Sequence, residues 1–116
     1  MTAMLELITA VIKPHKLDDV KEALLAAGVE GMTVTEVRGF GRQRGKTESF
    51  RGSEYQIDFI PKVKIEVVVA ADQAERIVEV ISGAAQTGKI GDGKVWRLNL
   101  NSLLRVRTGE QGTDAI

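Results

Sequence analysis

Apolar residues cluster or alternate over four short stretches of the chain that are typical of β-strands. Residues 5–12 are almost continuously apolar, which predicts a buried strand that ends where Pro14 can no longer donate to a sheet ladder. Residues 63–69 follow a period of two, and residues 33–40 and 95–100 are rich in strand-forming side chains. The pattern therefore predicts four strands.

Two stretches between these strands have the spacing of amphipathic helices. Asp18 and Asp19 place negative charge at the start of the first, and Gly28 follows its last turn. In the second, Asp72 and Glu75 resemble a capping box with Asp72 as the capping residue. The apolar positions that define the two faces are Val20, Ala23, Leu24 and Ala27, and Ala74, Ile77, Val78, Ile81 and Ala85.

The order of these elements is βαβ-βαβ, and it predicts an α+β fold in a single domain, residues 1–116. Two such units in about 100 residues favour a ferredoxin-like sandwich, with two helices on one face of a four-stranded antiparallel sheet. The other sheet face has no element of this chain to cover it. A second copy of the chain is its simplest cover.

Residues 41–56 do not fit a compact sandwich, because they lack apolar periodicity and contain three glycines. Connections of this length are usually functional. The expected loop, at about residues 41–57, would protrude and suits docking to a partner protein. Ser53 and Tyr55 are hydroxyl-bearing candidates for covalent modification, although both also fit the interpretation of ordinary loop residues.

Composition narrows the class of protein further. The 116 residues carry 16 basic and 16 acidic side chains, and the absence of net charge argues against a general nucleic-acid binder. The chain has no cysteine, and hence no disulfide framework. No signal-like or membrane-spanning apolar run is found, so we expect a cytoplasmic protein.

The most specific local motif is the glycine-rich segment at residues 87–94, TGKIGDGK. Its closely spaced glycines would let backbone amides approach a phosphate, and Lys94 would neutralise it. The spacing is not that of a Walker A loop, because Val95 follows Lys94 where Ser or Thr is required. A tight turn between helix and strand explains the same residues, and the segment alone does not decide between the two.

Two arginines near the C-terminus could add to an anion site. Arg105 and Arg107 alternate with apolar residues, so in an extended stretch both would point the same way and could grip a polyphosphate. A solvated edge strand is the alternative. Arg42 and Gln43 could contribute donors from the base of the loop, or could simply be polar loop residues.

Taken together, these segments resemble the PII signal-transduction family over nearly the whole chain. The most distinctive matches are TGKIGDGK at residues 87–94 and RVRTGE at residues 105–110. The other matching segments are residues 12–14 with 16–20, 31–37 with 39–43, 51–55 and 61–66.

The resemblance implies a homotrimer that binds ATP or ADP in the clefts between subunits. Gly91, Asp92, Gly93 and Lys94 would hold phosphates from one side, and the two arginines would reach them from the neighbouring subunit. Thr33 and the backbone near Val68 would hold the adenine. The implied nucleotide set is Thr33, Gly41, Arg42, Val68, Gly91, Asp92, Gly93, Lys94, Arg105 and Arg107.

A second effector, 2-oxoglutarate, is implied next to the nucleotide. Gln43, Lys62 and Gly91 would form its site, with Lys62 pairing with a carboxylate of the acid. A Mg²⁺ ion held by the ATP phosphates would join the acid to Gln43, with no dedicated protein cage for the metal.

The implied function is that of a non-enzymatic sensor of nitrogen, carbon and energy status that acts through its loop. Implied partners are an ammonium channel, enzymes of nitrogen metabolism or their modifying enzymes, so that contact with the membrane would be indirect. This chain has Phe50 where the family frequently has a tyrosine, so Tyr55 is the better candidate for modification on a tyrosine. Modification on Ser53 is the alternative.

Three other functions are weighed against this one. A PII-like regulator of a different small-molecule effector is the main alternative. An enzyme of similar fold would need a catalytic motif that the sequence lacks. An RNA-binding domain would need aromatic residues in a strand signature that is absent.

Overall fold

The computed structural model describes residues 4–41 and 58–116. These residues form four strands and two α-helices, which run in the predicted order. The elements are β1 (Leu5–Ile12), α1 (Leu17–Ala26), β2 (Thr33–Gly39), β3 (Ile60–Ala70), α2 (Ala71–Ala85) and β4 (Gly93–Leu100), with 3-10 turns η1 (Pro14–Lys16) and η2 (Gly112–Ala115).

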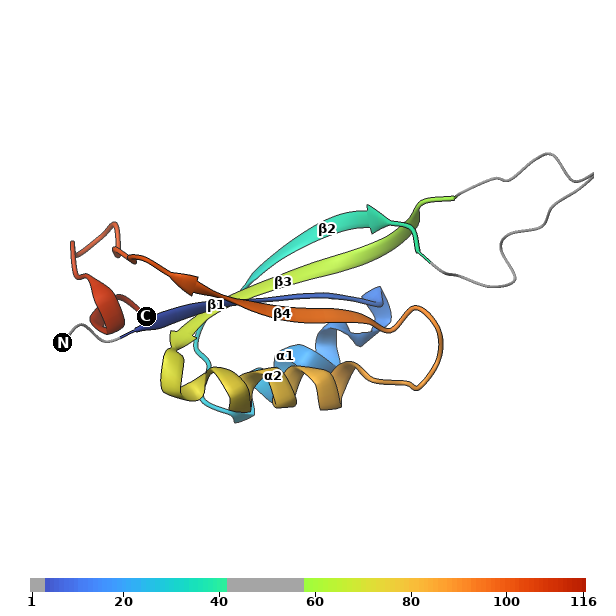
Figure 1. Ribbon diagram of the computed structural model, residues 1–116, viewed down its shortest axis with the longest axis horizontal. Coiled ribbons are helices and arrows are strands. Elements are labelled where there is room, and N and C mark those ends of the chain that lie inside the picture. Colours follow the sequence, from blue (N-terminus) through green and yellow to red (C-terminus); the bar gives the residue numbers. More distant parts are fainter. Residues whose placement is uncertain (1–3, 42–57) are drawn as a thin grey trace, which may run out of the picture.

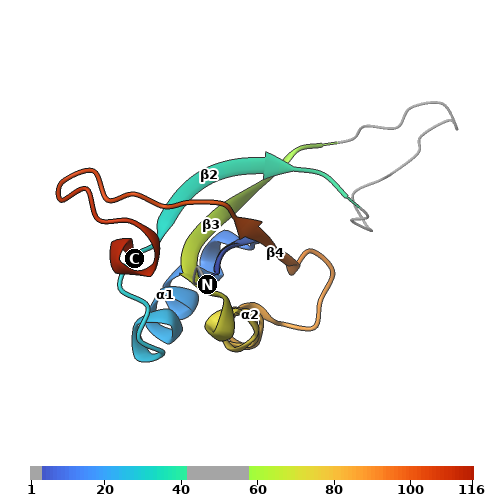
Figure 2. The ribbon, with the colours of Figure 1, turned by 60° about the vertical axis from the view of Figure 1, so that its left-hand side comes forward.

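The four strands form one sheet in the order β2-β3-β1-β4, and every neighbouring pair is antiparallel. Both helices cover the same face of this sheet (Figures 1 and 2). The predicted α+β sandwich of two βαβ units is therefore confirmed. The bounds of β2, β3 and β4 lie close to those that the sequence pattern predicts for these strands.

The hydrophobic core lies between the sheet and the two helices. β1 contributes Ile8, Ala10 and Ile12 to it, at every second position, as expected for a strand with one face against the helices. The remaining core residues are Val20 and Leu24 of α1, Val63, Ile65, Val67 and Val69 of β3, and Ala74, Ile77, Ile81 and Ala85 of α2. The predicted helical stripes thus face the sheet, with Ala23, Ala27 and Val78 only partly buried.

The opposite sheet face leaves large apolar side chains exposed. Strand register places Trp96 beside Thr9, and Leu98 beside Leu7, on the face that the core residues of β1 do not use. Trp96 is 42% exposed and Leu98 is 59% exposed. The predicted bare face is therefore present in the described parts of the chain.

α1 ends as its sequence predicts. Gly28 has a φ of +92°, which glycine tolerates, and its amide bonds to the carbonyl of Leu25. The amide of Val29 bonds to the carbonyl of Leu24. This pair of hydrogen bonds is the Schellman arrangement, which satisfies the last carbonyl groups of the helix.

The predicted cap of α2 is wrong. β3 passes directly into α2, so the position before the helix is Ala70, and no side chain caps it. Asp72 lies inside the first turn instead, where its charge still favours the helix dipole. The amide of Ala71 is satisfied by the carbonyl of Met4 at 2.9 Å, a contact that local sequence cannot reveal. Within residues 4–41 and 58–116, neither helix is long and apolar enough to cross a membrane.

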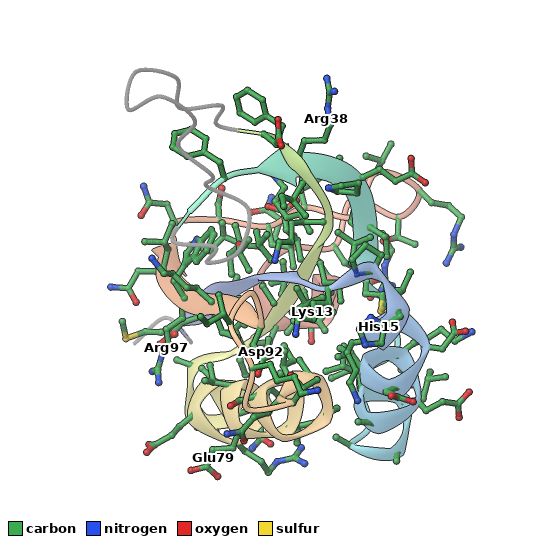
Figure 3. All side chains as sticks on the ribbon, turned by 90° about the vertical axis from the view of Figure 1, so that its right-hand side faces the viewer. Lys13, His15, Arg38, Glu79, Asp92 and Arg97 are labelled. Carbon is green, nitrogen blue, oxygen red and sulfur yellow. The ribbon has the colours of Figure 1, made fainter. Side chains whose placement is uncertain are left out.

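Glu6 breaks the apolar run of β1 because it has a partner on β4. Its carboxylate accepts two hydrogen bonds from the Arg97 guanidinium, at 2.6 and 3.0 Å. These hydrogen bonds lower the pKa of Glu6. Figure 3 shows Arg97 at the β4 edge of the sheet, on the side where α2 carries Glu79.

Candidate functional site

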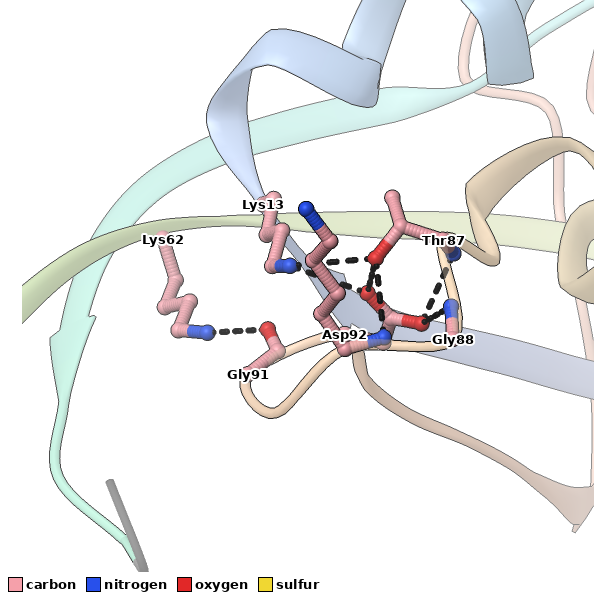
Figure 4. A network of polar contacts seen from close by, with 7 residues as sticks. Lys13, Lys62, Thr87, Gly88, Gly91 and Asp92 are labelled. Atoms are coloured by element: carbon pink, nitrogen blue, oxygen red, sulfur yellow. Dashed lines mark hydrogen bonds and ion pairs between the residues drawn. The ribbon is translucent and has the colours of Figure 1, made fainter. Parts of the chain in front are cut away.

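The glycine-rich turn between α2 and β4 is organised around the carboxylate of Asp92. One oxygen, Oδ2, accepts hydrogen bonds from the amides of Thr87 and Gly88, both at 2.8 Å. The other, Oδ1, accepts the Thr87 hydroxyl at 2.5 Å and lies 3.1 Å from the Lys13 ammonium (Figure 4). These hydrogen bonds, first those from Thr87, hold the pKa of Asp92 far below its ordinary value. The side chain of Asp92 therefore fixes the turn from within.

Gly93 sets the end of this turn against β1. It has a φ of +102°, and a Cβ atom added there would lie 1.8 Å from the carbonyl oxygen of Val11. Only glycine lets the turn and β1 approach this closely. The requirement explains one of the closely spaced glycines of the motif in terms of packing.

Lys62 joins β3 to the same turn. Its ammonium donates a hydrogen bond to the carbonyl oxygen of Gly91 at 2.5 Å, in a partly buried position (Figure 4). Burial, and then the charge of Lys13, lower the pKa of Lys62. Lys62 also lines a groove of about 520 Å³ together with Glu36 and Arg38 of β2. The predicted pair of Lys62 and Gly91 is thus brought together.

Thr33, Val68 and Arg105 come together in a different place. They line one cavity of about 730 Å³, formed by the turn after α1, the end of β3 and the C-terminal segment. Its lining is both polar and apolar, since Met32 and Ile77 lie beside Arg76 and Glu66. A cavity of this size and character is large enough for a small organic ligand.

The two C-terminal arginines do not share an extended stretch, so that prediction is wrong. Residues 103–112 fold back on themselves, with the amide of Arg105 bonded to the carbonyl of Glu110 and the amide of Gly109 to that of Arg105. Arg107 consequently lies exposed in a turn. The guanidinium of Arg105 pairs with the Glu110 carboxylate at 2.8 Å.

The two groups of predicted residues lie at opposite ends of the sheet. Ile12 pairs with both Gly93 and Val63, which places the glycine-rich turn at the end of β1. Val68 lies five residues further along β3, or about 16 Å at the rise of a strand. One chain therefore does not bring the whole predicted nucleotide set together.

Four predicted site residues, Arg42, Gln43, Ser53 and Tyr55, lie outside the described residues, and Gly41 is the last residue before them. An aromatic contact joins the described residues that come before and after this segment. The rings of Phe40 and Phe59 pack edge to face, with centroids 5.5 Å apart. The ends of β2 and β3 are therefore held side by side where the segment leaves the sheet.

Lys13 is the residue of this network that sequence reasoning missed. The sequence pattern gives Lys13 no role in the turn, although its ammonium reaches Thr87 and Asp92. Figure 3 shows Lys13 and Asp92 close together at one end of the molecule, between the sheet and α2. The sequence separation of 74 residues between Lys13 and Thr87 hides this contact from any local pattern.

No group of three or more His, Cys, Asp or Glu residues that could hold a metal ion occurs in residues 4–41 and 58–116. The charged side chains at the turn include the ammonium groups of Lys13 and Lys62 and the carboxylate of Asp92, and this excess of positive groups suits an anionic ligand.

Comparisons with known proteins agree on one family. Residues 5–110 match the family model described as Nitrogen regulatory protein P-II. The nitrogen regulatory protein P-II of Rhizobium meliloti is 60% identical over 109 residues, which cover 94% of this chain and 97% of that protein. Nitrogen regulatory protein GlnK of Escherichia coli is 52% identical over 112 residues, covering 97% and 100%. The crystal structure of Arabidopsis thaliana PII bound to citrate matches with a TM-score of 0.81 and 38% identity, covering 98% of this chain and 94% of that one.

Proposed function

Because the chain belongs to the nitrogen regulatory protein P-II family, we propose that it binds ATP or ADP together with 2-oxoglutarate and signals through residues 41–57. Members of this family are regulatory signalling proteins and not enzymes. The chain is accordingly a nitrogen regulatory protein, and the proposal concerns its effectors and how they act.

The nucleotide site is proposed to form between subunits of a homotrimer. Its two halves are the glycine-rich turn at one end of the sheet and the cavity lined by Thr33, Val68 and Arg105 at the other. Their separation within one chain supports a site that a neighbouring subunit completes. The exposed Trp96 and Leu98 supply an apolar face for that association.

The acid site is proposed at Lys62, and one observation carries this assignment. Among the described residues, the Lys62 ammonium has a neutral hydrogen-bond partner, the Gly91 carbonyl, in a partly buried position. A partly buried cation without a carboxylate directly against it favours an anionic ligand. Gln43, together with the ATP phosphates, would hold the Mg²⁺ ion to which 2-oxoglutarate binds.

Coupling to target proteins follows from where these groups lie. Gln43 lies near the start of the segment at residues 41–57 and Lys62 follows its end, so occupation of the acid site would change how this segment docks. The proposed targets are an ammonium channel, enzymes of nitrogen metabolism or their modifying enzymes, in a cytoplasmic setting.

Tyr55 and Ser53 remain the proposed modification positions. We take residues 1–116 as one domain, with residues 103–116 as its C-terminal segment.

A regulator that responds to a different effector is the second candidate. The Arabidopsis relative was crystallised with citrate, another carboxylic acid. A cationic site around Lys62 accepts carboxylates as a class, so this observation keeps the identity of the acid open to experiment.

The nucleotide site is tested with Arg107→Ala, which removes an exposed side chain from a turn. We expect ATP affinity to fall about tenfold or more, because a charge-assisted contact with phosphate is lost. Thermal stability should not change. Lys21→Ala removes an exposed charge from α1 and is the control. Wild-type ATP affinity in Arg107→Ala, measured by calorimetry, would remove Arg107 from the site.

A further inference from the structure

The end of the sheet that carries the glycine-rich turn holds a cluster of three charged groups. Lys13 and Lys62 contribute two ammonium groups, and Asp92 contributes one carboxylate (Figure 4). If all three are ionised, the cluster carries one net positive charge. How the carboxylate divides its contacts between the two lysines decides where that charge is available.

The structure shows an unequal division. Asp92 pairs with Lys13 at 3.1 Å, while its remaining hydrogen bonds come from Thr87 and Gly88. Lys62 donates to the neutral Gly91 carbonyl at 2.5 Å. The carboxylate is thus committed to Lys13 and the turn, and the uncompensated positive charge is left on Lys62.

We propose that Lys13 is a positioning residue for anion binding: it engages Asp92, holds the turn in place, and thereby keeps the Lys62 ammonium available for a carboxylate ligand. This inference rests on the proposed function in taking a dicarboxylic acid as the ligand. It adds a residue that contacts the turn and not the acid.

The contacts of Lys13 support this role. Its side chain is only 19% exposed, and its ammonium also reaches the Thr87 hydroxyl at 3.2 Å. Thr87 Oγ1 in turn accepts the amide of Lys89 at 3.1 Å. A partly buried lysine that contacts a turn at two points positions that turn more firmly than a solvent-exposed ion pair would.

Removal of Lys13 alone would leave Asp92 without its lysine partner. Asp92 would keep its charge, and Lys62 would become the nearest cation of the cluster. The cluster would then be neutral overall, and an incoming carboxylate would compete with Asp92 for Lys62. Glu36 and Arg38 line the groove beside Lys62. They carry opposite charges, so they do not change the net charge around Lys62 in either the wild type or the variant.

The first test needs no ligand. In full-length protein with labelled lysine side chains, NMR titration follows the ionisation of Lys62 in the wild type, Lys13→Gln and Lys16→Gln. We expect the pKa of Lys62 to rise in Lys13→Gln, because a neighbouring positive charge is lost while the Asp92 carboxylate remains. Lys16 pairs with Asp19 on the surface, so Lys16→Gln should leave the pKa unchanged. An unchanged pKa in Lys13→Gln would overturn the inference.

The second test measures 2-oxoglutarate affinity by calorimetry at saturating Mg²⁺ and ATP. Lys13→Gln should bind about tenfold more weakly than Lys16→Gln, and Lys13→Arg should stay near the wild type. The double variant Lys13→Gln with Asp92→Asn should regain a good part of the loss, because no carboxylate is left to capture Lys62. A purely structural role predicts the opposite, since the double variant loses more of the turn's hydrogen bonds.

The two tests separate the inference from the proposed function. If the wild type binds no 2-oxoglutarate, the proposed effector is wrong, and the ligand-free titration still decides how the charge is divided. If the wild type binds the acid and the double variant is no better than Lys13→Gln, the positioning role of Lys13 is wrong and the effector assignment stands.

Discussion

Gly93 shows at the scale of a single residue how packing, and not ligand binding alone, accounts for the glycine-rich motif. Its φ of +102° and the 1.8 Å approach of a built Cβ atom to the Val11 carbonyl both exclude a side chain. Gly88 has a φ of +86° but no atom within 4 Å of its Cβ position. The two glycines therefore carry different constraints within one turn.

Replacement of these glycines separates the two constraints. Gly93→Ala should lower the free energy of unfolding by about 3 kcal/mol or more, because it combines backbone strain with a clash against β1. Gly88→Ala should cost only about 1–2 kcal/mol, the strain of a left-handed residue. Urea unfolding of both variants at equal protein concentration measures the difference. Equal losses would show that the close approach of Gly93 to Val11 is not a constraint.

Asp92 adds a pH dependence at the same scale. Its pKa is depressed in the folded protein by hydrogen bonds from Thr87 first. A depressed pKa stabilises the fold above the ordinary aspartate pKa of about 3.9, and this contribution is lost as the pH falls below that value. Wild type should thus be more stable than Asp92→Asn at pH 7, and the gap should narrow below about pH 4. A gap that is constant from pH 7 to pH 3 would contradict the role of the charge.

At the scale of the elements, stability comes from the face that α2 turns to the sheet. Ala74, Ile77 and Ile81 are at most 1% exposed, and they follow the helical spacing that the sequence predicts. The same helix has no side-chain cap at its start, because it continues directly from β3. Packing, and not capping, thus holds this helix in place.

Ile77→Ala should lower the free energy of unfolding by about 2–5 kcal/mol, since it removes a fully buried side chain and leaves a cavity. Glu79→Ala, on the exposed side of the same helix, is the matched control and should change stability by less than about 0.5 kcal/mol. Chemical denaturation followed by circular dichroism checks both. Similar values for the two variants would contradict the assigned core.

Periodicity along the chain predicted the strands, the helices and their order, because each depends on residues close in sequence. Contacts between distant segments could not be predicted in this way. Lys13 meets Thr87 across 74 positions, and Glu6 meets Arg97 across 91. Such pairs depend on strand register, and the same holds for the Met4 carbonyl that replaces the expected cap of α2.

For the candidate site, local motifs identified the glycine-rich turn but not the hydrogen bonds within it. The family resemblance places Asp92 among the nucleotide-binding residues, and the structure adds that its carboxylate hydrogen-bonds to the turn itself. The family resemblance places Lys62 and Gly91 in one site, and the structure brings these two residues together. The expected alignment of Arg105 with Arg107 failed because the chain reverses between residues 103 and 112.

On the scale of the whole molecule, one apolar sheet face is uncovered and the two parts of the proposed nucleotide site lie apart within a single chain. Trp96 and Leu98 are exposed on the face away from the helices. The glycine-rich turn and the cavity around Thr33 lie at opposite ends of the sheet. A homotrimer would address both features, by covering the apolar face and by joining half-sites from neighbouring subunits.

Leu98→Asp should weaken this association, because it places a charge on the apolar sheet face. Leu25→Asp is the matched control, since Leu25 is equally exposed, at 57%, but lies on α1. Sedimentation velocity at several protein concentrations should show smaller species for Leu98→Asp only. A trimer that persists in Leu98→Asp would mean that this face is not the interface.

We propose that the protein senses an acid and a nucleotide together. This proposal is tested most directly by calorimetric titration of 2-oxoglutarate into the protein in the presence of Mg²⁺ and ATP, repeated with Mg²⁺ and ADP. ADP lacks the γ-phosphate, so it should not complete the proposed Mg²⁺ site. We predict binding of 2-oxoglutarate with ATP and little or none with ADP. Equal binding with both nucleotides, or binding with neither, would contradict the account.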